Sequence, residues 1–373
     1  FDTEWDYGFA KGLDTLIGTV DQMAMRPPDV MLPSHGPVIS EPKTQLAGYA
    51  RKLRQLKKRY VRGYPVSHLK DRQRDPLSRP TVVPEIFQVT PHLFKFNRPG
   101  EGSNFSIIVA DSGRAIMSDC GLMSAEYLDR ALAGMRTHLG LKKIDAMVIS
   151  HMHGDHFLLG EHLRTKYGAQ IWTLDRIAGK CEHPARYDYA AMLPSYNSGI
   201  DRLAIDRRLR DGEVVEWEGY RLQLDWMPGQ TEFGCCLWLE LDDLRVAFTG
   251  DNIFGDPSDA QQDGHEAVVA RNSAVFEEGY LYAAEYLKSL KPDLLIGGHS
   301  FVMPKPAEFI DRYHRWAQDM IRIYQDLLPG PDYRYRFDPY WVKAEPYRVH
   351  LEPGQSATVQ VVVRNFQTRD QSH

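Results

Sequence analysis

Cysteine is scarce in this chain of 373 residues, long apolar runs are absent, and neither sign of charge dominates. The four cysteines are too few for a disulfide framework at this length. No apolar run approaches the roughly 20 residues of a membrane-spanning helix, and no signal peptide is visible, so we expect no membrane partner. The net charge of −5 argues against nucleic acid as the main partner. The composition is that of a globular protein with two or three domains.

The first positive signal is an internal repeat, because residues 27–60 resemble residues 291–324. In one register, Pro28, Asp29, His35 and Pro42 match Pro292, Asp293, His299 and Pro306. Each copy predicts a buried strand, a histidine at its end, a proline-rich turn and an amphipathic helix, and another helical stretch precedes each copy. The first copy therefore resembles the closing half of a domain whose opening half lies outside this sequence.

The repeat and the changes in composition predict four parts. Residues 1–61 form the partial domain, and residues 62–83, rich in proline and arginine, form a linker. Residues 84–330 form a complete α/β domain. Residues 331–373 alternate in polarity and predict the start of an immunoglobulin-like β-sandwich or a β tail. We expect the partial domain to pack on the complete one or to pair with a companion chain or a missing segment.

Within the complete domain, strands and helices interleave, and several strand pairs resemble hairpins, so we expect mixed sheets covered by helices. The expected strands lie at 85–97, 103–111, 114–121, 144–150, 169–174, 214–227, 234–243, 244–251 and 293–299. The expected helices lie at 124–140, 157–168 and 272–290, followed by a long final helix. The start at Phe1 and the sandwich-like tail favour a secreted or periplasmic protein, and a cytoplasmic location stays open.

A turn crowded with histidines carries the chemistry. Directly after the strand at 144–150 come His151, His153, Asp155 and His156, although the whole chain has only 14 histidines. Imidazole nitrogens and carboxylate oxygens suit Zn²⁺, and also iron or manganese. Four such ligands within six residues exceed what one tetrahedral ion with an open position needs, so the turn suggests two ions. Gly154 allows the backbone to fold closely around them.

This turn resembles the HxHxDH signature of the metallo-β-lactamase superfamily. Later segments follow in the order of that family: "PGQT" at 228–231, "TGD" at 249–251 and "GGHS" at 297–300. The resemblance covers residues 84–329 and implies the αβ/βα four-layer sandwich of the family, here with an N-terminal half-domain and a short C-terminal β segment. It specifies the fold much better than the substrate, because this fold hosts many hydrolases.

The resemblance also implies the metal ligands. One ion would be held by His151 and His153, a second by Asp155, His156 and His299, and Asp251 would bridge both. We expect one or two zinc ions, with iron or manganese as alternatives, and we assign Asp155 a catalytic role in addition. A hydroxide bound between the ions would be the nucleophile. Asp119 occupies the position of a carboxylate that orients a histidine ligand, although it could also be an ordinary residue of a strand-end turn.

Gln230 departs from the family pattern, which usually has a histidine there to complete the first metal site. A neutral amide oxygen is a weaker donor than imidazole for a zinc-like ion. Three outcomes stay open: Gln230 binds the ion through its oxygen, binds it through water, or leaves the first site empty beside a mononuclear centre. His265 could substitute for the lost ligand, or be a surface histidine. His35 has no visible co-ligands in its own copy.

Two further segments contain candidate functional residues. The loop at 182–202 contains Tyr187, Tyr189 and Tyr196, which could line a substrate pocket or stabilise an oxyanion, or simply pack. The basic stretch at 49–64 raises the hypothesis of a nuclease. At helical spacing, however, its apolar residues form one stripe and leave the charges on a solvated face.

These observations predict a metal-dependent hydrolase that uses a metal-bound hydroxide on a small ester, lactone, thioester or amide, with a β-lactam as a further candidate. One alternative is a catalytically weak metal-binding scaffold domain, which Gln230 and the incomplete first copy make plausible. A second alternative is a phosphodiesterase or nuclease of the same fold. The expected partner is a small-molecule substrate.

Overall fold

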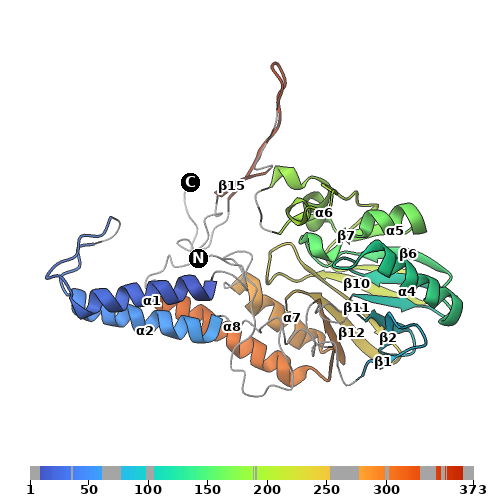
Figure 1. Cartoon of the computed structure of the whole chain (residues 1–373), viewed down its shortest axis with the longest axis horizontal. Coiled ribbons are helices and arrows are strands. Elements are labelled where there is room, and N and C mark those ends of the chain that lie inside the picture. The colour runs from blue at the N-terminus through green and yellow to red at the C-terminus, as the bar shows by residue number, and fades with distance from the viewer. Residues whose placement is uncertain are drawn as a thin grey trace.

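A computed structural model of the chain shows two large β-sheets packed face to face, with helices on the outside (Figure 1). The structure describes residues 9–34, 37–60, 77–97, 105–187, 189, 191–252, 277–298, 302–327, 342–345, 349 and 351–363. His35, His265 and His299 lie outside these residues.

The first sheet has eight strands in the order of the chain, and the second has six in the order β14-β13-β12-β11-β10-β9. The strands of the first sheet are β1 (Arg79–Pro80), β2 (Ile86–Gln88), β3 (Leu93–Phe96), β4 (Ser106–Val109), β5 (Arg114–Ser118), β6 (Lys143–Val148), β7 (Gln170–Leu174) and β8 (Arg207–Leu209). Those of the second are β9 (Glu213–Trp217), β10 (Tyr220–Trp226), β11 (Cys235–Leu241), β12 (Leu244–Gly250), β13 (Leu294–Gly297) and β14 (Val302–Pro304).

Both sheets change from antiparallel to parallel pairing along the chain. In the first sheet β1 to β5 form an antiparallel meander, and β5 to β8 then run parallel. In the second sheet β9 to β12 are antiparallel, and β12 pairs parallel with β13. Strands β5, β6, β12 and β13 therefore all end toward the region where the sequence places its candidate ligands. Ligands of open α/β sheets bind at the carboxyl ends of such strands.

Helices cover the outer face of each sheet. The helices are α1 (Phe9–Met25), α2 (Pro42–Tyr60), α4 (Ala125–His138), α5 (Gly160–Tyr167), α6 (Asp175–Glu182), α7 (Tyr282–Leu290) and α8 (Ala307–Leu327). Short helical turns are η1 (Gly154–His156), η2 (Pro184–Arg186), η3 (Leu193–Tyr196) and the π-helical η5 (Glu277–Leu281). Helices α4 to α6 lie on the side of the first sheet, and α7 and α8 on the side of the second (Figure 1). This is the predicted αβ/βα four-layer sandwich.

Two hydrophobic cores correspond to these layers. The larger one joins the two sheets to each other and to α4, through residues such as Leu128, Met147 and Phe248. The second lies between the six-stranded sheet and the helices α1, α2, α7 and α8. Cys235 and Cys236 illustrate the alternation along β11, because the first side chain belongs to the larger core and the second to the helical core.

Polar contacts also tie the two sheets together. Asp145 of β6 accepts a hydrogen bond of 2.9 Å from the Nε1 of Trp217 in β9 and one of 2.6 Å from Arg114. Asp242, in the turn between β11 and β12, accepts a hydrogen bond of 2.9 Å from the backbone N–H of His92. Although burial raises the pKa of Asp145, hydrogen bonds from Arg114 and Trp217 outweigh it and hold the pKa below its usual value.

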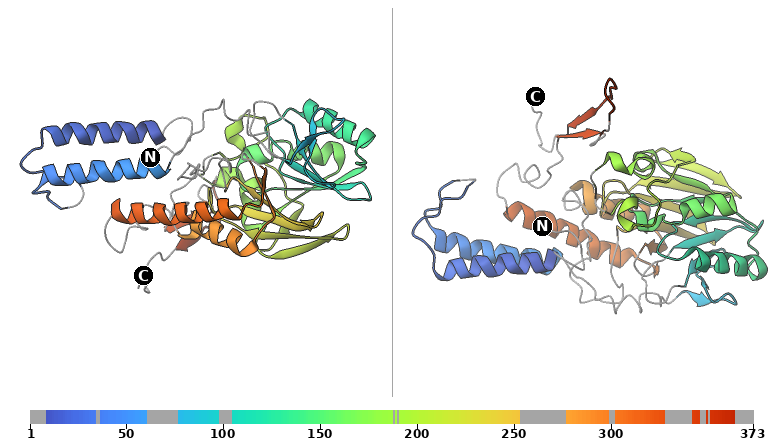
Figure 2. Two further views of the ribbon diagram at one scale, coloured as in Figure 1. Left: turned by 90° about the horizontal axis from the view of Figure 1, so that it is seen from below. Right: turned by 45° about the horizontal axis from the view of Figure 1, so that its top comes forward.

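The N-terminal helices form an antiparallel pair that packs on α8 and extends beyond the sheets (Figure 2). Leu13, Leu53 and Leu56 are buried in the same core as residues of α8. Lys52 of α2 forms an ion pair of 3.2 Å with Asp326 of α8. We call residues 9–60 the N-terminal unit and residues 277–327 the C-terminal unit.

The boundaries differ from the sequence-based expectation in several places, and α6, β8 and β14 were not expected. The first sheet begins inside the predicted linker, because Arg79 and Pro80 pair with β2 as an edge strand, a position that tolerates proline. The helix expected at 272–290 is described from residue 277 as η5 and α7, with non-helical backbone angles at Gly279. The strands expected at 85–97 and 214–227 are each a hairpin, and the second turns at Glu218 and Gly219, both with positive φ.

Two remaining expectations concern the tail and the membrane. Strands β15 (Val342–Glu345) and β16 (Gln360–Val363) form a separate antiparallel pair in the tail. Whether this pair begins an immunoglobulin-like sandwich stays a prediction. Among the helices of the described residues, none combines the length and hydrophobicity needed to cross a lipid bilayer.

Candidate metal centre

The histidine turn follows the carboxyl end of β6. Strand β6 is buried at five of its six positions, and the chain then passes through Ser150 to His151 and the single helical turn η1. His151, His153 and His156 are 3%, 4% and 0% exposed. Three buried imidazoles in six residues are costly to desolvate unless each has a partner. The turn can be this tight because a Cβ on Gly154 would lie 2.7 Å from the Cα of Leu193.

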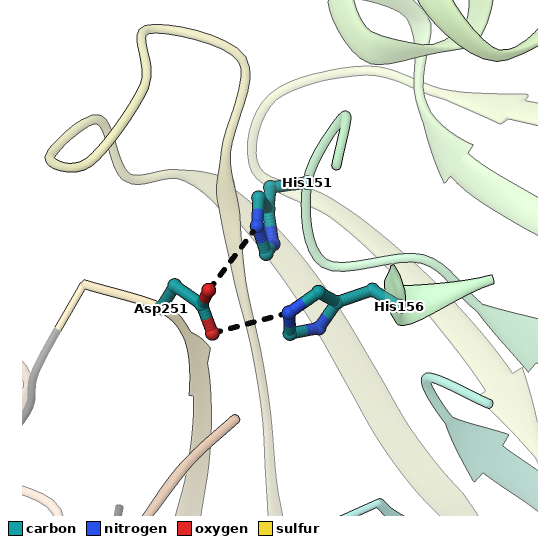
Figure 3. Close-up of side chains that lie close together, drawn as sticks. All are labelled: His151, His156 and Asp251. Carbon is teal, nitrogen blue, oxygen red and sulfur yellow. Dashed lines mark ion pairs between the residues drawn. The ribbon is translucent and has the colours of Figure 1, made fainter. Parts of the chain in front are cut away.

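His151, His156 and Asp251 converge although Asp251 comes from the other sheet, directly after β12 (Figure 3). Their ligand atoms all lie within 4.8 Å of one another, and all three residues are buried. The two carboxylate oxygens of Asp251 face different histidines. Oδ1 lies 3.1 Å from His156 Nε2, and Oδ2 lies 3.7 Å from His151 Nε2. One carboxylate thus stands between two imidazoles.

Asp119 fixes the orientation of His156 from behind. It follows β5 with a positive φ of 57°, and its Oδ2 lies 2.8 Å from His156 Nδ1. The same carboxylate accepts hydrogen bonds from the backbone N–H of Ser150 at 2.8 Å and from its hydroxyl at 2.7 Å. Because a carboxylate only accepts, Nδ1 of His156 must carry the hydrogen. Its Nε2 then faces Asp251.

Ser150 does the same for His151. The hydroxyl has one hydrogen, which it donates to Asp119, and its oxygen lies 2.9 Å from His151 Nδ1. The oxygen therefore accepts from Nδ1–H, which leaves Nε2 of His151 with a lone pair. In the part of the chain that the structure describes, this buried Nε2 makes no hydrogen bond. Both histidines therefore present Nε2 to the same small volume.

The charge environments of the two histidines differ. Burial lowers the pKa of His156, but the carboxylates of Asp251, Asp155 and Asp119 outweigh it and raise the pKa well above 6.5. Burial lowers the pKa of His151, and the neighbouring His156 lowers it further, so that it lies well below 6.5. In the absence of a cation, the carboxylates therefore favour the protonated form of His156, and burial favours the neutral form of His151.

His153 and Asp155 complete the turn. The ring of His153 lies 4.8 Å from the ring of His151, centroid to centroid. Asp155 lies with its Oδ2 3.7 Å from His156 Nε2, and its Oδ1 accepts a hydrogen bond of 2.8 Å from the hydroxyl of Tyr196. Tyr196 ends η3, so the loop at 182–202 reaches the predicted ligands through this one tyrosine.

Gln230 is 2% exposed and lies against Asp251. Its Nε2 donates a hydrogen bond of 3.1 Å to Asp251 Oδ2, the oxygen that faces His151. Since the carboxylate cannot donate, this contact fixes the amide orientation, and Oε1 must point elsewhere. This Oε1 is buried and makes no hydrogen bond to any described residue. The backbone N–H of Gln230 donates to Asn252 Oδ1 at 3.0 Å.

These residues fit a bound cation. A buried polar atom without a hydrogen bond is rare and costly, and here two such atoms, His151 Nε2 and Gln230 Oε1, are lone-pair donors. Two nitrogens and a carboxylate within 4.8 Å form a donor set that suits zinc and related ions. The structure brings together His151, His153, Asp155, His156, Gln230 and Asp251 of the predicted ligands.

Two glycines make the close approach possible. Gly250 has a φ of +52°, and a Cβ there would lie 2.7 Å from the hydroxyl of Ser150. A Cβ on Gly298 would lie 2.5 Å from Asp251 Oδ1 and 2.7 Å from His156 Cε1. Any larger residue at either position would displace a candidate ligand or its support. The backbone N–H of Gly298 donates to the carbonyl of Gly250 at 2.6 Å, which holds the ends of β12 and β13 together.

Tyr187 and Tyr189 lie apart from the cluster described so far. Their rings stack at 5.8 Å, and Tyr189 also contacts Phe233 at 5.2 Å. The ammonium of Lys180 in α6 lies 4.0 Å from the Phe233 ring centroid and 4.8 Å from that of Tyr187. Phe233 follows Gln230 by three residues in the chain. Both tyrosines pack within this aromatic group, and their part in a substrate pocket stays a prediction.

Sequence reasoning missed three contributors: Ser150, Asn252 and Lys180. Ser150 and Asn252 are neighbours of predicted ligands, and each supports one through a side-chain hydrogen bond. In the sequence, only their positions next to "HMHGDH" and "TGD" point to a role. Such a position does not show which residue the side chain contacts. Lys180 is 7% exposed, and no spacing in the sequence marks it as buried.

Known proteins resemble this chain in sequence. A sequence model of the metallo-beta-lactamase superfamily matches residues 99–299. A curated relative, the atrochrysone carboxyl ACP thioesterase of Claviceps purpurea, is 26% identical over 189 residues, which are 48% of this chain. The chain spans about half the length of that relative, 51%.

Solved structures of metallo-beta-lactamases also align with the chain. GOB-18 from Elizabethkingia meningoseptica has a TM-score of 0.48 and 17% identity, over 72% of this chain and 97% of that one. BJP-1 of Bradyrhizobium japonicum has a TM-score of 0.47 and 17% identity, over 65% and 93%. The family match covers more than half of the 373 residues and contains the histidine turn, Gln230 and Asp251. The chain is a member of the metallo-beta-lactamase superfamily.

Proposed function

We propose that this protein is a metal-dependent hydrolase that acts on a small ester, lactone, thioester or amide. The observation that carries the proposal is the buried cluster of His151, His156 and Asp251, whose ligand atoms lie within 4.8 Å. The cluster lies at the carboxyl ends of parallel strands in both sheets, where ligands of α/β proteins bind. Membership of the superfamily supports the same reaction type.

Some of these residues would bind a metal ion, and others orient those ligands. His151, His153 and Gln230 would hold an ion on one side of Asp251, and His156 and Asp155 on the other. When bound, such an ion lowers the pKa of water toward neutrality and polarises a carbonyl oxygen. Ser150 and Asp119 keep the imidazoles in the required tautomers. Tyr196 holds Asp155 through its hydroxyl.

The aromatic group of Tyr187, Tyr189 and Phe233 supports a substrate with an apolar acyl part. Tyr189 and Phe233 supply apolar ring surface, and Lys180 is held against Phe233 and Tyr187. The curated relative is named a thioesterase, which supports a thioester or a related ester as the substrate class. A β-lactam stays a candidate within the same amide class.

A substrate panel tests the proposal. The protein, stripped with a chelator and reloaded with zinc, iron or manganese, would be assayed on chromogenic esters, a lactone, a thioester, a β-lactam and a phosphodiester. We expect hydrolysis of at least one acyl substrate, lost on stripping and restored by metal. Activity on the phosphodiester alone would favour a nuclease instead. The variant Asp243→Asn, an exposed carboxylate in the β11–β12 turn, is the matched control and should keep full activity.

Gln230 supports a second candidate, a metal-binding scaffold with little turnover. Its amide donates to Asp251 and thereby competes with a cation for that carboxylate. If metal binds with a defined stoichiometry and every substrate of the panel stays intact, the scaffold is the better description. Elemental analysis of metal per chain therefore accompanies the panel.

A further inference from the structure

The N-terminal unit repeats the topology of the C-terminal unit. In the sequence, residue 28 matches residue 292, a shift of 264 positions. In the structure, Met31 and Ile39 form an isolated antiparallel bridge, with both hydrogen bonds at 3.0 Å. The same shift leads from this pair to Leu295 and Met303, which pair in β13 and β14. Under the same shift of residue numbers, α2 corresponds to α8.

The hairpin of the C-terminal unit is covered on both faces. Leu295 and Met303 belong to the core beneath the helices. Leu294, Ile296 and Val302 belong to the core between the two sheets and are 0%, 3% and 0% exposed. Strand β12 pairs parallel with β13 along its edge, with Val246 opposite Leu294 and Phe248 opposite Ile296.

The hairpin of the N-terminal unit is covered on one face only. Met31, the counterpart of Leu295, packs against the helical core. Val30, Leu32 and Val38, the counterparts of Leu294, Ile296 and Val302, are 51%, 78% and 62% exposed. We call these three side chains the open face. The division is selective, because Met31 and Ile39 on the helical side are half-buried, whereas the three residues on the inter-sheet side are exposed.

We propose that the open face is the inter-sheet face of a second domain of this fold, covered by a β-sheet from polypeptide outside residues 1–373. The repeat specifies the occupant, because in the C-terminal unit the equivalent face packs in the core between the two sheets and β12 pairs along the edge of β13. The first contact would be a strand parallel to residues 30–32. In a right-handed β-α-β unit the first strand comes before the helix in the sequence. The polypeptide that supplies the sheet is therefore expected to precede α1 in the sequence.

The test rebuilds the second domain from the chain itself. Residues 84–264 are placed directly before residue 1, because residue 1 corresponds to residue 265 under the shift. Hydrogen exchange of residues 29–33 is then compared between this extended chain and the chain 1–373. We expect exchange to slow at least tenfold in the extended chain. Unchanged exchange would contradict the proposal.

A triple variant, Val30→Ser with Leu32→Ser and Val38→Ser, gives an independent readout. In the chain 1–373 it should leave the urea midpoint unchanged, and in the extended chain it should lower the midpoint of the rebuilt domain. Val361→Ser, on an exposed side chain of β16, is the control and should be silent in both. A triple variant that is silent in both chains would contradict the proposal.

Two further measurements complete the test. If the extended chain does not fold, a synthetic peptide of residues 242–252, which contains β12, is added to the chain 1–373. It should slow exchange at residues 30–32 in the wild type and not in the triple variant, and failure to do so overturns the proposal. Light scattering tests a second copy as the occupant. A dimer of the chain 1–373 that the triple variant dissociates would assign the open face to self-association instead.

Discussion

The two carboxylate oxygens of Asp251 face two different histidines, His156 and His151. On the His156 side, Nδ1 of the imidazole is fixed by Asp119, and a second carboxylate, Asp155, lies near Nε2. On the His151 side, the neighbours are His153 and the neutral amide of Gln230. The His156 side is therefore surrounded by carboxylates, whereas the His151 side has mainly uncharged neighbours. From this comparison we predict that one carboxylate would serve two sites of unequal affinity, and that the His156 side would bind a cation more tightly.

The largest change should come from Asp251→Asn, because this carboxylate belongs to both sides. We expect metal affinity on both sides to fall by more than the 10–100-fold typical of an outer-shell change. Elemental analysis and competition with a chromogenic chelator measure the loss. Asp243→Asn should bind as the wild type does. An Asp251→Asn protein that keeps its full metal content would show that the oxygens do not act as ligands.

Asp119→Asn should weaken the His156 side most, by about 10–100-fold. The His151 side should weaken less, because Asp119 supports His151 only through the hydroxyl of Ser150. Asparagine tolerates the positive φ of this position, so the backbone is not strained. The amide no longer gives two acceptor oxygens to Ser150 and His156. A titration with zinc should show the tighter of two binding events weakened. Equal weakening of both events would remove the distinction between the sides.

Acidification should affect the two sides differently. Burial lowers the pKa of His156, but the surrounding carboxylates raise it further, so the folded value lies above 6.5. In chelator-stripped protein, the stability that this proton contributes is present below pH 6.5 and is lost as the pH rises through the folded pKa. A cation must displace the proton, so its affinity on the His156 side should rise about tenfold per pH unit until that pKa is passed.

The His151 side supplies the contrast, because the pKa of His151 is already low. Zinc affinity measured by calorimetry between pH 6 and 8 should therefore change strongly for one binding event and weakly for the other. His156→Asn should abolish the strong dependence. A dependence that survives in this variant would assign the proton to another group.

Gln230→His should strengthen the His151 side and raise the metal content toward two ions per chain. Imidazole is a stronger donor than the amide for a zinc-like ion. The variant also removes the hydrogen bond from Nε2 to Asp251, which frees that oxygen. Gln88→His, at an exposed position of β2, is the control. Unchanged stoichiometry and affinity would mean that Gln230 does not limit this side.

The smallest effect is expected for Tyr196→Phe, a few-fold loss in zinc affinity on the His156 side. The change removes one hydrogen bond to Asp155 and keeps the ring. Tyr189→Phe, in the same loop, should leave zinc binding unchanged. If both variants bind zinc equally, Tyr196 has no role in positioning Asp155.

The sequence revealed those parts of the molecule that depend on local spacing. The histidine turn was recognisable because its ligands lie within six residues, and most strands were recognisable from their apolar runs. The edge strand at Arg79 and the break at Gly279 depend on packing partners, so no local pattern predicts them. The orientation of the Gln230 amide depends on a carboxylate 21 residues away in the chain.

The open face was predictable only in part. The repeat predicts an incomplete first copy, which stays a prediction. Which side of its hairpin is uncovered depends on how α1 and α2 pack on α8. Tyr49 is another difference. Helical spacing places it in the apolar stripe of residues 49–64, but it is exposed, whereas Leu53 and Leu56 of the same helix are buried.

The metal cluster draws its histidines from the loop after β6 and its carboxylate from the loop after β12, so it joins the eight-stranded sheet to the six-stranded one. An ion held there would act as a crosslink across the middle of the sandwich, and it would be released when the halves separate. Binding then adds to the free energy of unfolding, by about 2.7 kcal/mol when the free metal concentration is a hundred times the dissociation constant. A simple melting curve recorded with different ions would consequently rank the metals that this protein prefers, before any substrate is known.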